Sequence, residues 1–406
     1  MRFLDALAAP GFGAIAEFKR RSPSAGDIAP GADAAATARA YEAAGARAMS
    51  VLVDERFGGT WDDLRAARAA ATLPLLAKGF FSTRAHLETA RDAGADAVLL
   101  LLRDLDDTAV RELSAVAASL GLDTLVEAHD AVELDRATAL GAPVVGVNAR
   151  DLSTFAIDRR AQLALVARAP RDRVVIAESA VASRAHAAAA ELAGADAILV
   201  GTTLMRAPDP AAKLRELLSR PLVKVCGLTR QEDVDAAVEA GADLVGFILA
   251  AESPRRAPAL LDAPETVLRV AVFVGEREEA EADLVQFYAR ENGHRARDAA
   301  LLRGDEQVGT VVDLPWLEED PSHLERARAT EGRVMLAGGL GPENVAAAVS
   351  AVRPWAVDSA RSTERAPGVK DHEALRRWVE AARGVGSTEP RQSGGAGFAG
   401  AGAGSR

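Results

Sequence analysis

The chain has 406 residues, of which 49% are apolar, so it is long enough and apolar enough to build two domains with sizeable cores. Its 48 basic and 59 acidic residues give a net charge of −11, which argues against a nucleic acid or an anionic membrane surface as a partner. The single cysteine, Cys226, excludes an intrachain disulfide and favours a reducing, cytoplasmic setting.

A short phrase recurs along the chain: a helix end, a glycine, a small residue and then four or more apolar residues. Its glycines are Gly45, Gly94, Gly141, Gly194 and Gly241. Glycine suits the left-handed cap that ends many helices, and an apolar run too short for a helix is typical of a strand buried on both faces. With the apolar runs between them, these phrases predict eight strands in the first half, at 14–19, 48–54, 73–78, 97–103, 123–128, 144–150, 173–179 and 197–203. Ala-rich amphipathic segments separate the strands, so residues 1–220 are expected to form a closed (β/α)8 barrel, with an open doubly wound sheet as the alternative.

Polar side chains stand at the ends of these strands, where barrel enzymes carry their chemistry. They are Glu17, Lys19, Lys78, Glu127, Asn148, Arg150, Glu178 and Ser179. One such residue alone would be read as a solvated rim residue, but charges of both signs at one mouth can shift one another's pKa values, as acid–base catalysis requires. Gly201, followed by Thr202, lets backbone N–H groups approach a phosphate. The residues alone therefore predict acid–base catalysis on a phosphorylated small molecule.

Near Pro221 the pattern starts again. A second series of strands is predicted at 222–226, 244–250, 269–274, 283–288, 298–303, 308–313, 333–339 and 355–360. Residues 221–383 are expected to form a second, compact and divergent barrel, because a (β/α)8 barrel typically takes about 250 residues. Residues 384–406 are rich in Gly, Ala and Ser, cannot bury a core, and are predicted to be a disordered tail. The expected fold class is thus α/β, with two tandem (β/α)8 TIM barrels.

Six stretches of the first half, in this order, resemble the indole-3-glycerol phosphate synthase family: IAEFKRRSPSAG, LLAKGFF, LVEAHD, VGVNARDL, IAESAV and ILVGTTLM. That family closes the indole ring of a carboxyphenylamino-deoxyribulose phosphate, with loss of CO2 and water. The resemblance implies that Lys78 is the general acid of ring closure and that Glu127 is the acid/base of dehydration. It also implies that Lys19 and Glu17 hold the substrate carboxylate and assist proton transfer.

The same resemblance assigns the remaining positions of the first half. Asn148 and Arg150 would orient the substrate, and Glu178 and Ser179 match a pair of the family. The implied substrate-binding residues are Ser22, Phe57, Phe80, Gly201 and Thr202. Phe57 and Phe80 would line the pocket of the aromatic ring, with an ordinary core position as the alternative. Ala180 stands where the family has glycine and is expected to crowd a phosphate contact.

The second half resembles phosphoribosylanthranilate isomerase, the preceding enzyme of tryptophan biosynthesis, in KVCGLTR, GADLVGFIL, SPRR, AGGLGPENV and APGVKD. That family carries out an Amadori rearrangement with a cysteine base and an aspartate acid, which implies Cys226 and Asp313. Lys224, two residues before Cys226, is expected to lower the pKa of the thiol. Arg255 and Asp358 resemble substrate-binding residues of the family. A phosphate-cradling glycine of the family is missing, and Arg361 is expected to replace it with a charge.

These observations leave three hypotheses. The leading one is a bifunctional enzyme acting on phosphorylated small molecules, without a metal or cofactor. The second is a synthase whose second barrel is a non-catalytic structural or binding module. The third is an unrelated barrel enzyme acting on a phosphosugar. The sequence leaves the oligomeric state open, with a monomer among the options.

Overall fold

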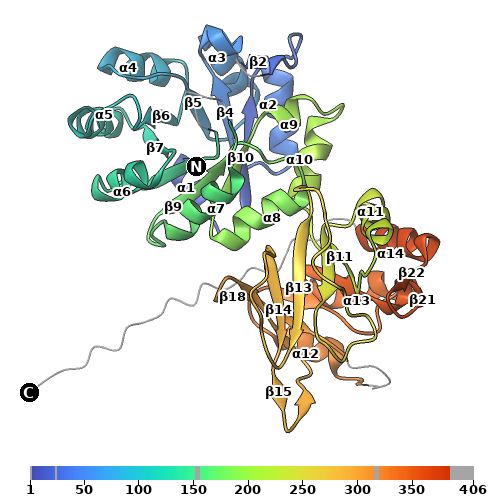
Figure 1. Cartoon of the computed structure of the whole chain (residues 1–406). Coiled ribbons are helices and arrows are strands. Elements are labelled where there is room, and N and C mark those ends of the chain that lie inside the picture. Colours follow the sequence, from blue (N-terminus) through green and yellow to red (C-terminus); the bar gives the residue numbers. More distant parts are fainter. Residues whose placement is uncertain (1, 23–24, 151–155, 315–319, 385–406) are drawn as a thin grey trace, which may run out of the picture.

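The computed structural model describes residues 2–22, 25–150, 156–314 and 320–384. In this part of the chain, two closed eight-stranded barrels follow one another (Figure 1). The predicted α/β fold of two tandem barrels is confirmed. The boundary expected at residues 220/221 stays a prediction, and residues 385–406 of the predicted tail lie outside the described residues.

The first barrel is built from eight parallel strands that pair in chain order and close between the first and the last. They are β1 (Gly13–Phe18), β4 (Ala48–Leu52), β5 (Leu75–Lys78), β6 (Ala97–Leu101), β7 (Asp123–Ala128), β8 (Val144–Asn148), β9 (Val174–Glu178) and β10 (Ala197–Val200). Nearly every residue in them is buried, as expected for strands covered on both faces. Their positions follow the predicted ranges, because short apolar runs are a strong signal for such strands.

Helices surround this barrel, and Ser, Thr or Asp caps precede most of them. They are α2 (Ala34–Ala43), α3 (Trp61–Ala70), α4 (Arg84–Asp92), α5 (Asp107–Ser119), α6 (Ala131–Ala139), α7 (Arg159–Arg168), α8 (Arg184–Ala193), α9 (Thr202–Met205) and α10 (Pro210–Leu218), with the short elements β2 (Arg21–Ser22), β3 (Gly26–Asp27) and η1 (Glu55–Phe57) in the loops. Helix α1 (Phe3–Leu7) adds Phe3 and Leu7 to the apolar cluster that fills the barrel interior. The interior is therefore a packed core, which leaves the carboxyl ends of the strands for a site.

The second barrel contains β11 (Leu222–Cys226), β12 (Leu244–Ile248), β13 (Leu268–Val274), β14 (Leu284–Tyr288), β17 (Ala299–Arg303), β18 (Glu306–Val312), β19 (Val334–Leu336) and β20 (Ala356–Ser359). All eight correspond to predicted strands, but β17 runs antiparallel to both of its neighbours. The second barrel is thus divergent, as predicted, and departs from the regular (β/α)8 pattern at β17. A hairpin of β15 (Arg290–Glu291) and β16 (His294–Arg295) joins β14 to β17, and a tight turn at Gly304 joins β17 to β18.

Among the described residues, no helix lies between β12 and β18, which explains why this barrel needs so few residues. Its helices are α11 (Gln231–Glu239), α12 (His323–Ala329), α13 (Val345–Val352) and α14 (His372–Gly384), with η2 (Arg361–Thr363), β21 (Glu364–Ala366) and β22 (Val369–Lys370) after the last barrel strand. Trp378 of α14 is fully buried and packs in the apolar layer between these helices and the sheet. Helices thus cover one side of the barrel only.

Helix α8 lies at the boundary between the two barrels (Figure 1). Its residues Ala187 and Ala190 belong to the core of the first barrel, whereas Ala188 and Leu192 belong to the apolar cluster that fills the second. Nine of its ten residues are buried, which fits a helix that is apolar nearly all round. Near the end of α8, Glu191 accepts a hydrogen bond from Arg333 of the second barrel. The barrels are thus joined by a shared core element.

Candidate active sites

A cavity of about 750 Å³ opens at the carboxyl ends of the first barrel's strands. Its lining includes these predicted residues: Glu17, Lys19, Ser22, Phe57, Lys78, Phe80, Glu127, Asn148, Arg150, Ser179, Gly201 and Thr202. Glu178 lies beneath this surface, fully buried, and contacts Lys78. The structure therefore brings together the residues predicted for the first site, because parallel strands end at one mouth.

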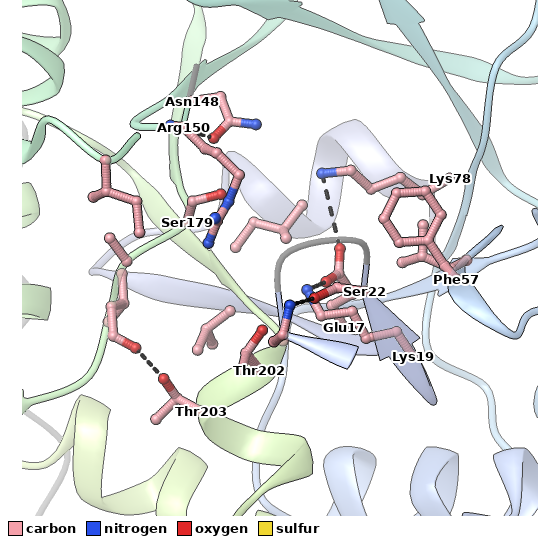
Figure 2. Close-up of a pocket in the computed structure, with 18 of the residues that line it drawn as sticks. Glu17, Lys19, Ser22, Phe57, Lys78, Asn148, Arg150, Ser179, Thr202 and Thr203 are labelled. Carbon is pink, nitrogen blue, oxygen red and sulfur yellow. Dashed lines mark hydrogen bonds and ion pairs between the residues drawn. The ribbon is translucent and has the colours of Figure 1, made fainter. Parts of the chain in front are cut away.

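Lys78 occupies the centre of this site, at the end of β5, surrounded by three carboxylates. Its ammonium nitrogen lies 2.5 Å from Glu178, 3.4 Å from Glu127 and 3.8 Å from Glu17. A second ammonium group, that of Lys19, lies 2.6 Å from the other oxygen of Glu17. Figure 2 shows Lys78 and Glu17 reaching toward each other in the pocket. The site thus holds two ammonium groups against three carboxyl groups.

The pKa values of this cluster are pushed apart. Burial opposes the charge on Lys78, but its contacts with Glu178, Glu127 and Glu17 outweigh it and raise the pKa of the ammonium group above its usual value. For Glu127, the charge of Lys78 and hydrogen bonds outweigh burial, so that its pKa is lowered. Burial and the charge of Glu127 raise the pKa of Glu178 to about 8.

Glu178 is the carboxyl group closest to Lys78. This contact favours the ionised form of Glu178, whereas burial and the charge of Glu127 favour the neutral form. We favour the neutral acid, because Glu17 and Glu127 already balance the charges of Lys19 and Lys78. A neutral Glu178 can still accept a hydrogen bond from Lys78 at Oε2. Two carboxyl groups of one pocket with opposite pKa shifts are typical of acid–base catalysis.

His129 is a residue of this site that the sequence prediction missed. Its Nε2 lies 3.1 Å from Oε1 of Glu127, and its Nδ1 lies 3.0 Å from Glu133. Asn148 donates a hydrogen bond to the same oxygen of Glu127, at 3.0 Å. Burial opposes the charge on His129, but the two glutamates outweigh it and raise the pKa of the imidazole to about 10. His129 follows Glu127 by two residues in LVEAHD, so the i, i+2 spacing was a usable signal.

The loops after β9 and β10 each have a backbone feature that favours glycine. A Cβ at Gly201 would lie 2.2 Å from Oε1 of Glu17, so only glycine leaves room for this carboxylate. Ser179 and Ala180 have φ of 70° and 56°, in the left-handed region that favours glycine. Such a conformation costs about 1–3 kcal/mol at each residue and persists only where neighbours hold it. The alanine expected to crowd the phosphate contact is thus a point of backbone strain.

Neighbouring side chains hold this turn in place. Arg159 donates a hydrogen bond of 2.9 Å to the carbonyl of Ala180. Thr203, labelled in Figure 2, donates one of 2.6 Å to the carbonyl of Val181. Gly201 and Thr202 lie in the adjoining loop, at the start of α9. The two loops therefore face one corner of the cavity with backbone groups, an arrangement that can take a phosphate.

A second cavity, of about 640 Å³, opens in the second barrel. It is lined by the predicted residues Cys226, Arg255, Asp313, Asp358 and Arg361. Arg255 pairs with Glu364 at 2.9 Å. The strand ends again bring together residues that lie far apart in the chain, and β18 delivers Asp313 although β17 before it runs in the opposite direction.

A chain of hydrogen bonds links the two sides of this second site. Lys224 donates to Asp358 at 2.8 Å and to the amide oxygen of Gln286 at 2.7 Å. The amide nitrogen of Gln286 donates to the hydroxyl of Tyr288, which donates to Asp313 at 2.9 Å. Gln286 and Tyr288 share one face of β14, as the period of a strand requires. Sequence reasoning missed both residues, although they lie in the predicted strand at 283–288.

Arg295 also reaches this site from the β15–β16 hairpin. Its guanidinium lies 3.1 Å from Asp313 and 4.1 Å from the centre of the Tyr288 ring. The hairpin turns at Asn292 and Gly293, both in the left-handed region. An Asn-Gly pair is the strongest short-range hairpin signal, so the sequence did carry this information.

The expectation for Cys226 needs correction. Burial raises the pKa of its thiol, and the nearby charge of Lys224 does not outweigh it. Lys224 is itself committed to Asp358 and Gln286, and it is fully buried. A Cβ at Gly246 would lie 2.8 Å from the sulfur, so the thiol is also closely packed. The thiol, rather than the thiolate, is therefore the resting form.

Other classes of site find little support in the described residues. None of the helices there combines the length and the apolar character needed to cross a bilayer. No group of three or more His, Cys, Asp or Glu side chains in the described ranges is placed to hold a metal ion.

Comparison with known proteins finds a matching family for a region of each barrel. Residues 1–217 match the model of the family "Indole-3-glycerol phosphate synthase", and residues 302–381 match that of "N-(5'phosphoribosyl)anthranilate (PRA) isomerase". The latter segment includes Asp313, Asp358 and Arg361 but not Cys226. An indole-3-glycerol phosphate synthase of Leifsonia xyli subsp. xyli is 50% identical over 215 residues, which are 52% of this chain and 82% of the relative. An indole-3-glycerol phosphate synthase of Mycobacterium ulcerans is 46% identical over 220 residues, which are 53% of this chain and 81% of the relative.

Solved structures similar to this chain include phosphoribosylanthranilate isomerases of Thermus thermophilus and Thermotoga maritima. The first is 30% identical with a TM-score of 0.32, and covers 40% of this chain and 98% of its own. The second is 26% identical with a TM-score of 0.32, and covers 41% and 100%. The family model covers more than half of the chain, and the relatives above agree with it. The chain therefore belongs to the indole-3-glycerol phosphate synthase family, and it carries a phosphoribosylanthranilate isomerase domain C-terminal to the synthase.

Proposed function

We propose that the two pockets catalyse two consecutive steps of tryptophan biosynthesis, the second barrel preparing the substrate of the first. The chain is a bifunctional enzyme with synthase and isomerase regions, and it acts on phosphorylated small molecules. We place both reactions in the cytoplasm, in keeping with the single cysteine.

The observation that carries the synthase proposal is the position of Lys78 among three carboxyl groups. Ring closure joins an aromatic carbon to the sugar carbonyl carbon, and the carbonyl oxygen must receive a proton as this bond forms. Lys78 is held protonated by Glu127 and its neighbours, so it is in the form that a general acid needs. Its side chain is only 13% exposed, so a charge that develops on the carbonyl oxygen meets the ammonium group with little screening.

Glu127 is the candidate for the proton transfers of dehydration. Its lowered pKa keeps it ionised, and a hydrogen bond from Asn148 and the ion pair with His129 fix one of its oxygens. Its other oxygen, Oε2, lies 3.4 Å from the ammonium group of Lys78, so the acid and the base stand side by side. Loss of the hydroxyl as water needs a proton delivered to the oxygen and one removed from the ring, and an acid and a base side by side can do both.

The remaining residues of the first pocket bind the substrate in this proposal. Lys19 offers a cation to the anthranilate carboxylate, near the point where CO2 departs. Phe57 and Phe80 line the wall where the aromatic ring fits. The turn at Ser179 and the loop at Gly201 take the phosphate.

In the second barrel, the thiolate form of Cys226 removes a proton from the sugar carbon and becomes a thiol, and Asp313 protonates the ring oxygen as the ring opens. The network from Lys224 through Gln286 and Tyr288 holds Asp313 at the opposite side of the same cavity. Arg361 lines the cavity beside the start of η2 and is the candidate for the phosphate.

Two separate assays on the purified protein test the proposal. Phosphoribosylanthranilate is supplied for the isomerase, and the carboxyphenylamino-deoxyribulose phosphate for the synthase. We expect the wild type to turn over both. Synthase activity without isomerase activity would leave the second barrel as a structural or binding module, and absence of both would refute the proposal.

A further inference from the structure

The strained turn of the synthase pocket is held partly by the second barrel. His186, in the first turn of α8, accepts a hydrogen bond at Nδ1 from the backbone N–H of Ala182, at 3.1 Å. Its Nε2 lies 2.7 Å from the carbonyl oxygen of Glu265, which belongs to the second barrel. These partners define the tautomer, because an acceptor at Nδ1 requires the proton to be on Nε2. A single imidazole ring thus connects the turn to the other domain.

A second cross-domain contact, between Ser183 and Thr266, lies beside the first and reinforces it. Ser183 caps α8, and its hydroxyl oxygen accepts from the backbone N–H of His186 at 3.1 Å. The same hydroxyl donates to the carbonyl of Thr266, at 2.8 Å. Because the cap and the cross-domain bond use one hydroxyl group, the start of α8 is positioned by the second barrel.

The segment of the second barrel that makes these contacts is the connection from β12 to β13. This connection has no helix, in contrast to the repeat of a regular barrel, and it reaches the first pocket. Glu265 itself lines that pocket, together with Arg159 and His186. The second domain therefore contributes to the wall of the synthase site.

We propose that the second barrel is a positioning element of the synthase site: the carbonyl groups of Glu265 and Thr266, acting through His186 and Ser183, hold the strained turn from Ser179 to Ala182 in the form that binds the substrate phosphate. This inference rests on the proposed function, which assigns the phosphate to that turn. It goes further by giving the isomerase domain a part in synthase substrate binding. Two left-handed residues in sequence need outside support, and three of the groups that supply it are Arg159, Thr203 and His186.

The test uses the full chain and two variants, each of which removes one of the two cross-domain bonds at the start of α8. Asparagine can offer an acceptor near the position of Nδ1 but is too short to reach Glu265, so His186→Asn removes the cross-domain bond. Ser183→Ala removes the bond to Thr266 together with the cap of α8. Arg333→Ala is the matched control, because it removes a cross-domain bond to Glu191 at the far end of α8.

For each protein, the synthase KM and kcat and the inhibition constant of inorganic phosphate are measured, with circular dichroism as the check of folding. We expect His186→Asn and Ser183→Ala each to raise KM and the phosphate inhibition constant by about 5-fold, the factor for one lost hydrogen bond, with kcat changed less than about 2-fold. Arg333→Ala should leave all three constants near the wild-type values.

Unchanged KM and phosphate inhibition in Ser183→Ala and in folded His186→Asn would overturn the inference alone. An equal rise of KM in Arg333→Ala would overturn it too, since the effect would then come from general loosening of the interface. If His186→Asn does not fold, Ser183→Ala decides. A wild type without synthase activity would instead overturn the proposed function, and this inference with it.

Discussion

Replacing Lys78 by methionine removes the cation at the centre of the synthase pocket but keeps most of its apolar stem. If Lys78 is the general acid, turnover should fall by about 10²- to 10⁴-fold, the contribution usual for such a group. The same change leaves Glu17, Glu127 and Glu178 buried without their central cation, with Lys19 still paired to Glu17 and His129 to Glu127. Removal of one partner from a buried ion pair costs about 3–5 kcal/mol in folding free energy.

This cost should depend on pH in a definite direction. Without Lys78, one carboxyl group must take up an additional proton in the folded state, so its folded pKa lies above the unfolded value. Such a group favours folding at low pH, and the advantage is lost as the pH rises through the folded pKa. Each pH unit over which the folded variant holds that proton is worth about 1.4 kcal/mol. Between about pH 8 and about pH 6, the stability gap to the wild type should therefore narrow by up to about 2.7 kcal/mol.

Urea unfolding of both proteins at the two pH values measures this gap, and synthase kinetics measure the turnover. Lys213→Met is the control, because Lys213 pairs with Glu216 outside both pockets and should show neither effect. A Lys78→Met enzyme with near wild-type turnover would refute the catalytic assignment. A stability gap that is equal at both pH values would refute the electrostatic account of the cluster.

Four further predictions concern the second barrel and His129. Cys226→Ala and Asp313→Asn should abolish isomerase turnover while the synthase reaction continues, and loss of both activities would argue against separate sites. Because burial raises the pKa of the Cys226 thiol, isomerase kcat/KM of the wild type should still rise with pH above about 8, and a plateau near neutrality would contradict this. Arg361→Ala should raise the isomerase KM with less effect on kcat, as expected for lost ground-state binding, and the reverse pattern would remove Arg361 from the phosphate site. The pKa of His129 is raised to about 10, so its contribution to stability should be complete below the usual pKa of about 6.5 and lost as the pH rises through about 10. Melting temperatures of the wild type and His129→Gln across this pH range measure the contribution. A difference in melting temperature that stays constant with pH would contradict the prediction.

The amino-acid sequence by itself determined the strands and most of the first site. Short apolar runs after helix-ending glycines specify buried strands almost wherever they occur. Once the strands are parallel, their ends must share one mouth, so Glu17, Lys78, Glu127 and Glu178 could be grouped without knowledge of their distances. Even the hairpin that carries Arg295 had its signal in Asn292 and the following glycine.

Only the tertiary structure decided the direction of β17, the surroundings of Cys226 and the partner of α8. An apolar run predicts a strand but not its direction, which depends on the connection before it. The pKa of Cys226 depends on depth of burial and on partners of Lys224 that lie far away in the chain. The alanines of α8 indicate a helix buried all round, yet which surface covers its second face is a matter of long-range packing. Local sequence specifies local geometry, whereas burial and charge balance arise from contacts between distant segments.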